Sequence, residues 1–138
     1  MDHDFFMAKA IELARENVRA GRGGPFAALV VKDGAIVASG VNMVTSANDP
    51  TAHAEVVAIR EACGALRTFQ LDGCDIYTSC EPCPMCMGAI YWARPARVFF
   101  AGTRADALSG KSKGGKPRAR LKETDLSRLF GVDIVGKG

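Results

Sequence analysis

Two short segments with metal-binding side chains constrain this chain more than any other feature. They read His53-Ala54-Glu55 and Pro82-Cys83-Pro84-Met85-Cys86. Each segment lies where a loop or strand gives way to a pattern typical of a helix. Because proline suits the first position of a helix, the second segment predicts a helix that begins near Pro84. Cys83 and Cys86 then lie on one face of its first turn.

These residue types predict an open zinc site. Free N–H groups and the helix dipole favour thiolates at a helix start, and two thiolates make half of a tetrahedral zinc site. His53 adds an imidazole from the start of another helix. Three protein ligands leave the fourth position to water, as in catalytic zinc sites. Glu55 is then placed to take a proton from that water and to pass it to a substrate.

Three alternatives for the cysteines stay open at this point. Cys80, Cys83 and Cys86 resemble the opening of an iron–sulfur run, although no cysteine follows at the next expected step. Cys83 and Cys86 alone could form a redox pair, which leaves His53 and Glu55 unexplained. Cys80 could also close the zinc site as a fourth ligand. The five cysteines are an odd number, which does not suit a disulfide framework and favours a cytoplasmic protein.

Hydrophobic periodicity predicts the order α-β-β-α-β-α-β, followed by a short helix and a last strand. The predicted helices span residues 4–20, 52–66, 84–93 and, as a short helix, 121–129. The predicted strands span residues 26–31, 36–41, 74–78, 98–101 and 132–135, with Asp33-Gly34 in a hairpin turn between the first two. The predicted apolar face of the first helix comprises Phe5, Ala8, Ile11, Leu13, Ala14 and Val18.

This order predicts an α/β fold in which helices cover both faces of a sheet. A chain of 138 residues suits a single domain over residues 1–138. No apolar run approaches the roughly 20 residues that a membrane-spanning helix needs, so we expect no membrane association.

Positive charge is concentrated at the C-terminal end. Residues 1–110 carry 10 Lys and Arg against 12 Asp and Glu, whereas residues 111–138 carry 8 against 3. The densest run, from Lys111 to Arg120, could attract a polyanion such as tRNA. The same run has too few apolar residues to pack, so it also fits a flexible, solvated basic loop.

The two segments and several longer stretches resemble the cytidine deaminase superfamily, and within it the bacterial guanine deaminases. His-x-Glu followed by Pro-Cys-x-x-Cys is the signature of zinc nucleobase deaminases. The stretches that carry the resemblance are residues 23–26, 31–34, 48–55, 77–86 and 88–94.

The resemblance implies a three-layer α/β/α sandwich with a central mixed five-stranded sheet and one Zn²⁺ per subunit. It implies hydrolytic deamination of a nucleobase or nucleoside with release of ammonia, with a guanine-like purine as the first expectation. The alternatives are a tRNA adenosine deaminase, which shares both motifs, and a cytosine or cytidine deaminase. A homodimer or larger assembly is also implied, with Tyr91 and Trp92 either at a subunit interface or in the pocket.

The resemblance also assigns roles around the metal. His53, Cys83 and Cys86 would be the ligands and Glu55 the catalytic residue. Phe26 would stack on the base, with an edge of the core as its alternative place. Asn42 would hydrogen-bond the ring, with a turn as its alternative. The backbone N–H groups of Ala54 and Cys83 would hold the substrate carbonyl or the activated water.

The resemblance runs from about Phe5 to Ala107 and then ends. Guanine deaminases of this kind continue with a Gly-Phe-Asp-Asp segment, whose second aspartate contacts guanine. They also have a longer C-terminus that supplies an aromatic residue to a neighbouring subunit. Here residues 108–114 read Leu-Ser-Gly-Lys-Ser-Lys-Gly. The sequence therefore predicts the reaction and leaves the choice of base open.

Overall fold

The computed structural model describes residues 2–102 and 133–136 of the chain. Its helices and strands follow in the order α1 (His3–Arg19), β1 (Ala27–Lys32), β2 (Ala35–Val41), α2 (Ala54–Leu66), β3 (Cys74–Cys80), α3 (Pro84–Ala93), β4 (Arg97–Gly102) and β5 (Asp133–Gly136). This is the predicted order. The predicted basic loop at 111–120 and the predicted helix at 121–129 lie outside the described residues.

The five strands form one mixed sheet in the order β2-β1-β3-β4-β5. Strand β1 is antiparallel to both β2 and β3, whereas β3, β4 and β5 run parallel. The hairpin between β1 and β2 turns at Asp33 and Gly34, whose φ angles of 51° and 77° are those that a tight two-residue turn requires. The predicted mixed five-stranded sheet is confirmed.

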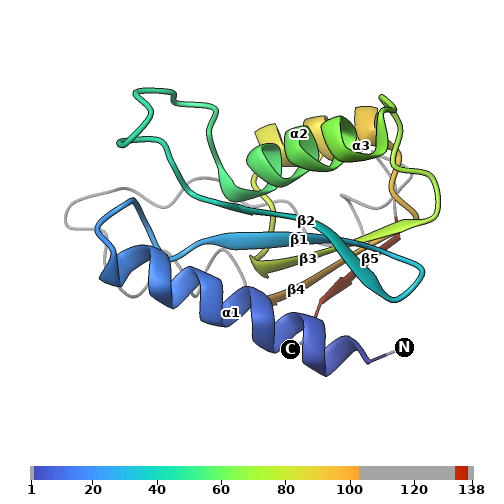
Figure 1. Ribbon diagram of the computed structural model, residues 1–138, viewed down its shortest axis with the longest axis horizontal. Helices are drawn as coiled ribbons and strands as arrows, with labels where there is room; N and C mark the ends of the chain where they lie inside the picture. The colour runs from blue at the N-terminus through green and yellow to red at the C-terminus, as the bar shows by residue number, and fades with distance from the viewer. Residues whose placement is uncertain (1, 103–132, 137–138) are drawn as a thin grey trace.

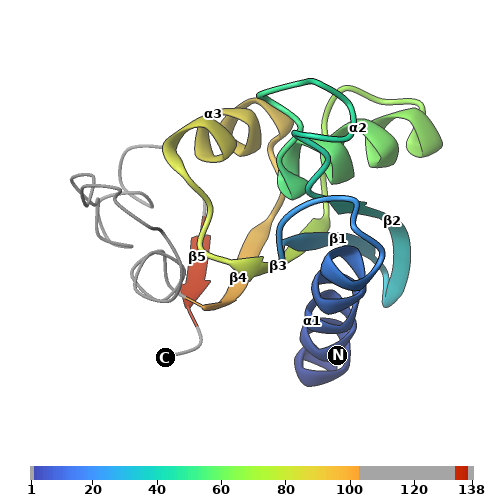
Figure 2. The same cartoon turned by 90° about the vertical axis from the view of Figure 1, so that its left-hand side faces the viewer.

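Helix α1 covers one face of the sheet, and α2 and α3 cover the other (Figures 1 and 2). The strands alternate accordingly. In β1, Ala28 and Val30 belong to the core under α2 and α3, whereas Leu29 and Val31 pack with α1. Alternate residues of β1 therefore face the two cores, and the predicted α/β/α sandwich is confirmed.

The predicted apolar face of α1 is right at Ala14, which is buried, and at Ile11 and Leu13, which pack partly buried against the core, and it is wrong at Phe5, Ala8 and Val18, which are exposed. The buried residues of this helix are Phe6, Met7, Ala10, Ala14 and Asn17. Phe5 and Val18, which the pattern placed in the core, are 57% and 50% exposed. Asn17 also belongs to the buried face, because it hydrogen-bonds to the backbone of two segments distant in the sequence, and hydrophobicity alone does not predict this.

Helix α2 lies unusually close to the sheet at Gly40 of β2. A Cβ atom on Gly40 would lie 2.4 Å from the backbone nitrogen of Ala58 and 2.5 Å from the carbonyl oxygen of Ala54. Only glycine permits this approach. Because Ala54 is the first residue of α2, the contact fixes the helix start that carries the first predicted segment.

Within the part of the chain that the structure describes, no helix has the length and apolar character needed to cross a membrane.

Candidate active site

The structure brings the three predicted metal ligands together at the starts of two helices. His53 is the N-cap residue of α2, and Cys83 is the N-cap residue of α3. Cys86 lies in the first turn of α3 and is fully buried. The Nδ1 atom of His53 lies 3.5 Å from the Cys83 sulfur and 3.6 Å from the Cys86 sulfur. All three ligand atoms lie within 4.8 Å of one another.

These separations fit a tetrahedral zinc ion. With Zn–S near 2.3 Å and Zn–N near 2.0–2.1 Å, tetrahedral angles put a ligand nitrogen about 3.6 Å from a ligand sulfur. The two observed distances agree with this value, so the side chains could hold zinc in their present positions. Among residues 2–102 and 133–136, the group whose ligand atoms converge contains these three residues and not Cys80. A closed site with Cys80 as the fourth ligand is therefore not what these residues form.

The two cysteine side chains form a hydrogen bond with each other. A hydrogen bond from the Cys86 thiol lowers the pKa of Cys83 to about 5. The same pairing, together with burial, raises the pKa of Cys86. The backbone N–H of Cys86 also points at the Cys83 sulfur, at 3.5 Å. One thiolate is thus already favoured at the start of α3, and a bound divalent cation would displace the proton of the other.

Glu55, the second residue of α2, lies beside this cluster with only 7% of its surface exposed. Burial is the main cause that raises its pKa from 4.5 to about 7. A hydrogen bond with the Cys86 thiol acts in the opposite direction. A carboxyl group that changes its protonation state near neutral pH, next to a metal site, is suited to accept a proton and then donate it.

The three predicted substrate contacts lie at the start of α2 and at the open end of the β1–β2 hairpin. Ala54 is the first residue of the helix and is fully buried; the N–H groups of a first helical turn have no acceptor within the helix. Phe26 packs partly buried against the core under α2 and α3. Asn42 directly follows β2, and its Oδ1 accepts a hydrogen bond from the Val44 N–H at 3.2 Å. The roles of these residues toward a substrate remain predictions.

One buried polar residue near the site was missed by the sequence reasoning. Asn17 is 0% exposed, and its amide hydrogen-bonds to the carbonyl groups of Gly24 and Asn42. The signal that could have revealed its burial is its position, because residues 10, 14 and 17 follow helical spacing and therefore lie on one face of α1. A polar residue in that series is easily assigned to the solvent face, and only the tertiary partners reveal why it is buried.

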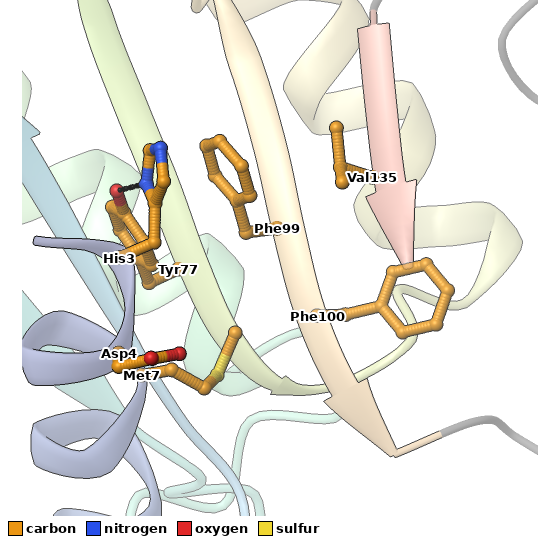
Figure 3. A pocket seen from close by; sticks show the side chains of 7 residues that line it. All are labelled: His3, Asp4, Met7, Tyr77, Phe99, Phe100 and Val135. Carbon is orange, nitrogen blue, oxygen red and sulfur yellow. Dashed lines mark hydrogen bonds between the residues drawn. The ribbon is translucent and has the colours of Figure 1, made fainter. Parts of the chain in front are cut away.

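A separate apolar hollow of about 200 Å³ lies between α1 and strands β3, β4 and β5 (Figure 3). It is lined by His3, Asp4, Met7, Tyr77, Phe99, Phe100 and Val135. The rings of Tyr77 and Phe99 stack 4.9 Å apart, and His3 hydrogen-bonds the Tyr77 hydroxyl. Because α1 covers the face opposite α2 and α3, this hollow is distinct from the metal-binding cluster.

Comparisons with known proteins agree with this geometry. The family model for the cytidine and deoxycytidylate deaminase zinc-binding region matches residues 1–102. Guanine deaminase of Bacillus subtilis (strain 168) is 64% identical over 107 residues, which cover 78% of this chain and 69% of that protein. A tRNA-specific adenosine deaminase of Aquifex aeolicus (strain VF5) is 40% identical over 101 residues, which cover 73% of this chain and 66% of that protein.

The solved structure of guanine deaminase from Bacillus subtilis superposes with a TM-score of 0.78 over 95% of this chain and 92% of that chain. Sequence identity over this longer superposition is 50%, compared with 64% over the 107 residues of the sequence match. The additional residues therefore contribute few identical positions, in agreement with a resemblance that ends near Ala107.

Proposed function

Because this chain belongs to the family defined by the cytidine and deoxycytidylate deaminase zinc-binding region, we propose that its substrate is a free purine base, with guanine first. The chain is a zinc-dependent hydrolytic deaminase. The observation that carries the proposal is the convergence of His53, Cys83 and Cys86 beside the buried Glu55. The 64% identity to a guanine deaminase favours guanine over other bases.

We assign His53, Cys83 and Cys86 as the zinc ligands and Glu55 as the catalytic residue. Zinc at this position would supply Lewis-acid activation of a water molecule. Glu55 accepts a proton from the attacking water and delivers it to a ring nitrogen, and it then passes the remaining proton of the added hydroxyl to the leaving amino group. The overall change replaces the amino group by a carbonyl oxygen and releases ammonia. The pKa of Glu55, raised to about 7, suits both directions of transfer.

The remaining residues position the base in this proposal. The Phe26 ring stacks on the base, and the Asn42 side chain donates its Nδ2 hydrogen atoms to the ring. The backbone N–H groups of Ala54 and Cys83 stand at helix starts, where they can hold the substrate carbonyl oxygen. These donors lie on the same side of the sheet as the metal ligands.

A second candidate is deamination of adenosine in tRNA. The 40% identity to the tRNA-specific adenosine deaminase supports it, as does the excess of 8 Lys and Arg over 3 Asp and Glu in residues 111–138. A base flipped out of an RNA loop can reach a zinc site as a free base does, but adenine carries its amino group on C6 and guanine on C2. The two functions therefore share the zinc chemistry and differ in how the pocket orients the purine and in what lies outside the pocket.

The protein's organisation completes the proposal. We treat residues 1–138 as one deaminase domain that works in purine metabolism in the cytoplasm, where the five free cysteines would stay reduced. We also propose a homodimer. Trp92 on α3 is 74% exposed and Met85 at the start of α3 is 37% exposed, so apolar surface is available on this helix for a partner subunit.

A deamination screen of the zinc-loaded protein tests the substrate. It measures ammonia from guanine, adenine, cytosine, their nucleosides and tRNA, with Glu55→Ala as the inactive control. We expect guanine to have the highest kcat/KM and the control to release none. Turnover confined to tRNA, falling steeply with salt concentration, would establish the second candidate instead. Guanine turnover that survives in Glu55→Ala would refute the assigned chemistry.

A further inference from the structure

The side chain of Asn17 joins three segments of the chain. It is fully buried in the last turn of α1. Its Nδ2 donates to the backbone carbonyl of Gly24 at 2.9 Å and to the backbone carbonyl of Asn42 at 3.0 Å. Gly24 lies in the loop before β1, and Asn42 directly follows β2. A single amide group thus ties α1 to the open end of the hairpin formed by β1 and β2.

Gly24 and Asn42 are connected by backbone hydrogen bonds to Phe26, one of the two residues whose side chains are proposed to bind the base, and Asn42 is the other. The Phe26 N–H donates to the Gly24 carbonyl at 2.8 Å, and the Asn42 N–H donates to the Phe26 carbonyl at 3.1 Å. Asn17 therefore bonds Asn42 directly and is linked to Phe26 through one shared acceptor.

Asn42 is confined from other directions as well. A Cβ atom on Gly23 would lie 2.3 Å from the Asn42 carbonyl oxygen, so the loop packs directly against this group. The Val44 N–H engages the Asn42 Oδ1 at 3.2 Å. With its main chain held by Asn17 and its Oδ1 engaged by Val44, Asn42 has its Nδ2 group set in one direction for donation.

The Oδ1 atom of Asn17 indicates why this position holds an asparagine. Its Oδ1 is buried and has no hydrogen-bond partner among residues 2–102 and 133–136. A buried acceptor without a partner opposes folding, and an apolar side chain would fill this position without that effect. The two bonds donated by Nδ2 are therefore the feature that distinguishes asparagine from an apolar residue at this position.

We propose that Asn17 is a positioning residue for base recognition: it holds Asn42, and with it Phe26, in the geometry that binds the ring. The inference rests on the proposed function for the identity of that ring. Asn17 belongs to α1, on the opposite face of the sheet from α2 and α3 (Figure 2). Its loss therefore leaves the metal ligands and Glu55 in place and acts on substrate binding.

The test compares Asn17→Ala with Met7→Ala, a matched control on the same helix whose buried side chain packs in the α1 core away from the loop. In Asn17→Ala we expect KM to rise about tenfold or more, with kcat within about threefold of the wild type and zinc content unchanged. Met7→Ala should lower the melting temperature without changing KM. Asn17→Ser, which keeps one donor, should recover part of the lost affinity.

A double-mutant cycle tests whether Asn17 acts through Asn42. The KM of the double variant Asn17→Ala, Asn42→Ala should be close to that of Asn42→Ala alone, because the second change removes the group that the first one positions. Fully additive effects, an unchanged KM in Asn17→Ala, or a KM effect equal to that of Met7→Ala would overturn the inference.

Hydrogen exchange gives a readout that does not depend on the substrate. In Asn17→Ala the amides of Phe26, Asn42 and Val44 should exchange faster, with those of α2 and α3 unchanged; Met7→Ala should not show this pattern. If the wild type does not deaminate guanine, the proposed function fails, and the KM comparison is made on the substrate that the screen identifies. If exchange at these three amides is unchanged, the positioning role fails whatever the substrate is.

Discussion

The close contact between Gly40 and α2 makes Gly40→Ala a sharp probe of how the fold positions the active site. The added Cβ would lie 2.4 Å from the Ala58 nitrogen and 2.5 Å from the Ala54 oxygen. Ordinary van der Waals contact begins near 3.4 Å. The helix must therefore move away from the sheet by about 1 Å, because both opposing atoms belong to its backbone and neither can rotate aside.

Two consequences follow from a displacement of this size. Overpacking of this kind costs about 1–3 kcal/mol, which corresponds to a fall in melting temperature of roughly 4–10 °C for a domain of this length. The movement also carries His53 and Glu55 away from Cys83 and Cys86, which α3 holds. A misplacement of about 1 Å in a catalytic site can reduce the rate about 100-fold, so we expect kcat/KM to fall by that order.

The assay measures the melting temperature, zinc content and ammonia release of Gly40→Ala beside those of Gly64→Ala. Gly64 lies within α2, and a Cβ there would meet nothing within 4 Å. Alanine at that helix position should raise stability by about 0.5–1 kcal/mol and leave activity unchanged. Wild-type activity and stability in Gly40→Ala would refute the argument that the contact with β2 sets the positions of His53 and Glu55.

Three further predictions concern the charge, the metal and the assembly. In zinc-free protein, Glu55→Gln should be more stable than the wild type by at most about 3 kcal/mol above pH 7 and equal to it near pH 4, because ionisation of Glu55 opposes folding increasingly as the pH rises from its unfolded pKa of 4.5 to its folded pKa of about 7. Denaturant melts across this pH range measure the difference in the free energy of unfolding. A difference that does not change with pH would contradict the prediction. Chelation of zinc should lower the melting temperature by about 5 °C or more and abolish ammonia release, and re-addition of Zn²⁺ should restore both. Activity that persists in metal-free protein would exclude the zinc chemistry. Trp92→Glu should weaken dimerisation at least about tenfold, as measured by sedimentation or light scattering. The control is Phe69→Glu, which changes an aromatic residue that is 82% exposed and lies outside α3, and it should leave dimerisation unchanged. Equal effects of the two substitutions would argue against an interface on α3.

Local signals in the sequence were sufficient to predict several elements. Helix α3 begins at Pro84 and ends at Ala93, as predicted, because proline at the first position and Cys83 as the N-cap define its start within the chain itself. The turn at Asp33 and Gly34 is likewise predicted from a local signal, because an Asp-Gly pair between two apolar runs is typical of a tight hairpin turn. These features depend on neighbouring residues alone.

Features that depend on distant partners were predicted less well. Strand β3 extends to Cys80, beyond the predicted end at residue 78, because Cys80 pairs with Gly102 of β4. Helix α2 begins at Ala54 and not at residue 52, since His53 keeps an extended backbone as the N-cap. The burial of Asn17 could not be predicted from hydrophobicity, because the partners that stabilise it come from two other segments.

The candidate site shows the same division. Residue types and spacing predicted that His53, Cys83 and Cys86 would converge, and the structure places their ligand atoms within 4.8 Å of one another. The lowered pKa of Cys83 arises mainly from its hydrogen bond with Cys86, and the raised pKa of Glu55 arises mainly from burial. Such effects require the folded arrangement and leave no mark in a linear motif.

The central claim is that Glu55 moves the protons while His53, Cys83 and Cys86 hold the zinc. The most direct test is the kcat for ammonia release from guanine by zinc-loaded Glu55→Gln, measured on samples whose zinc content is determined in parallel. The account predicts one zinc per chain, as in the wild type, and a kcat reduced by about 1,000-fold. Full zinc occupancy with a kcat within tenfold of the wild-type value would contradict it.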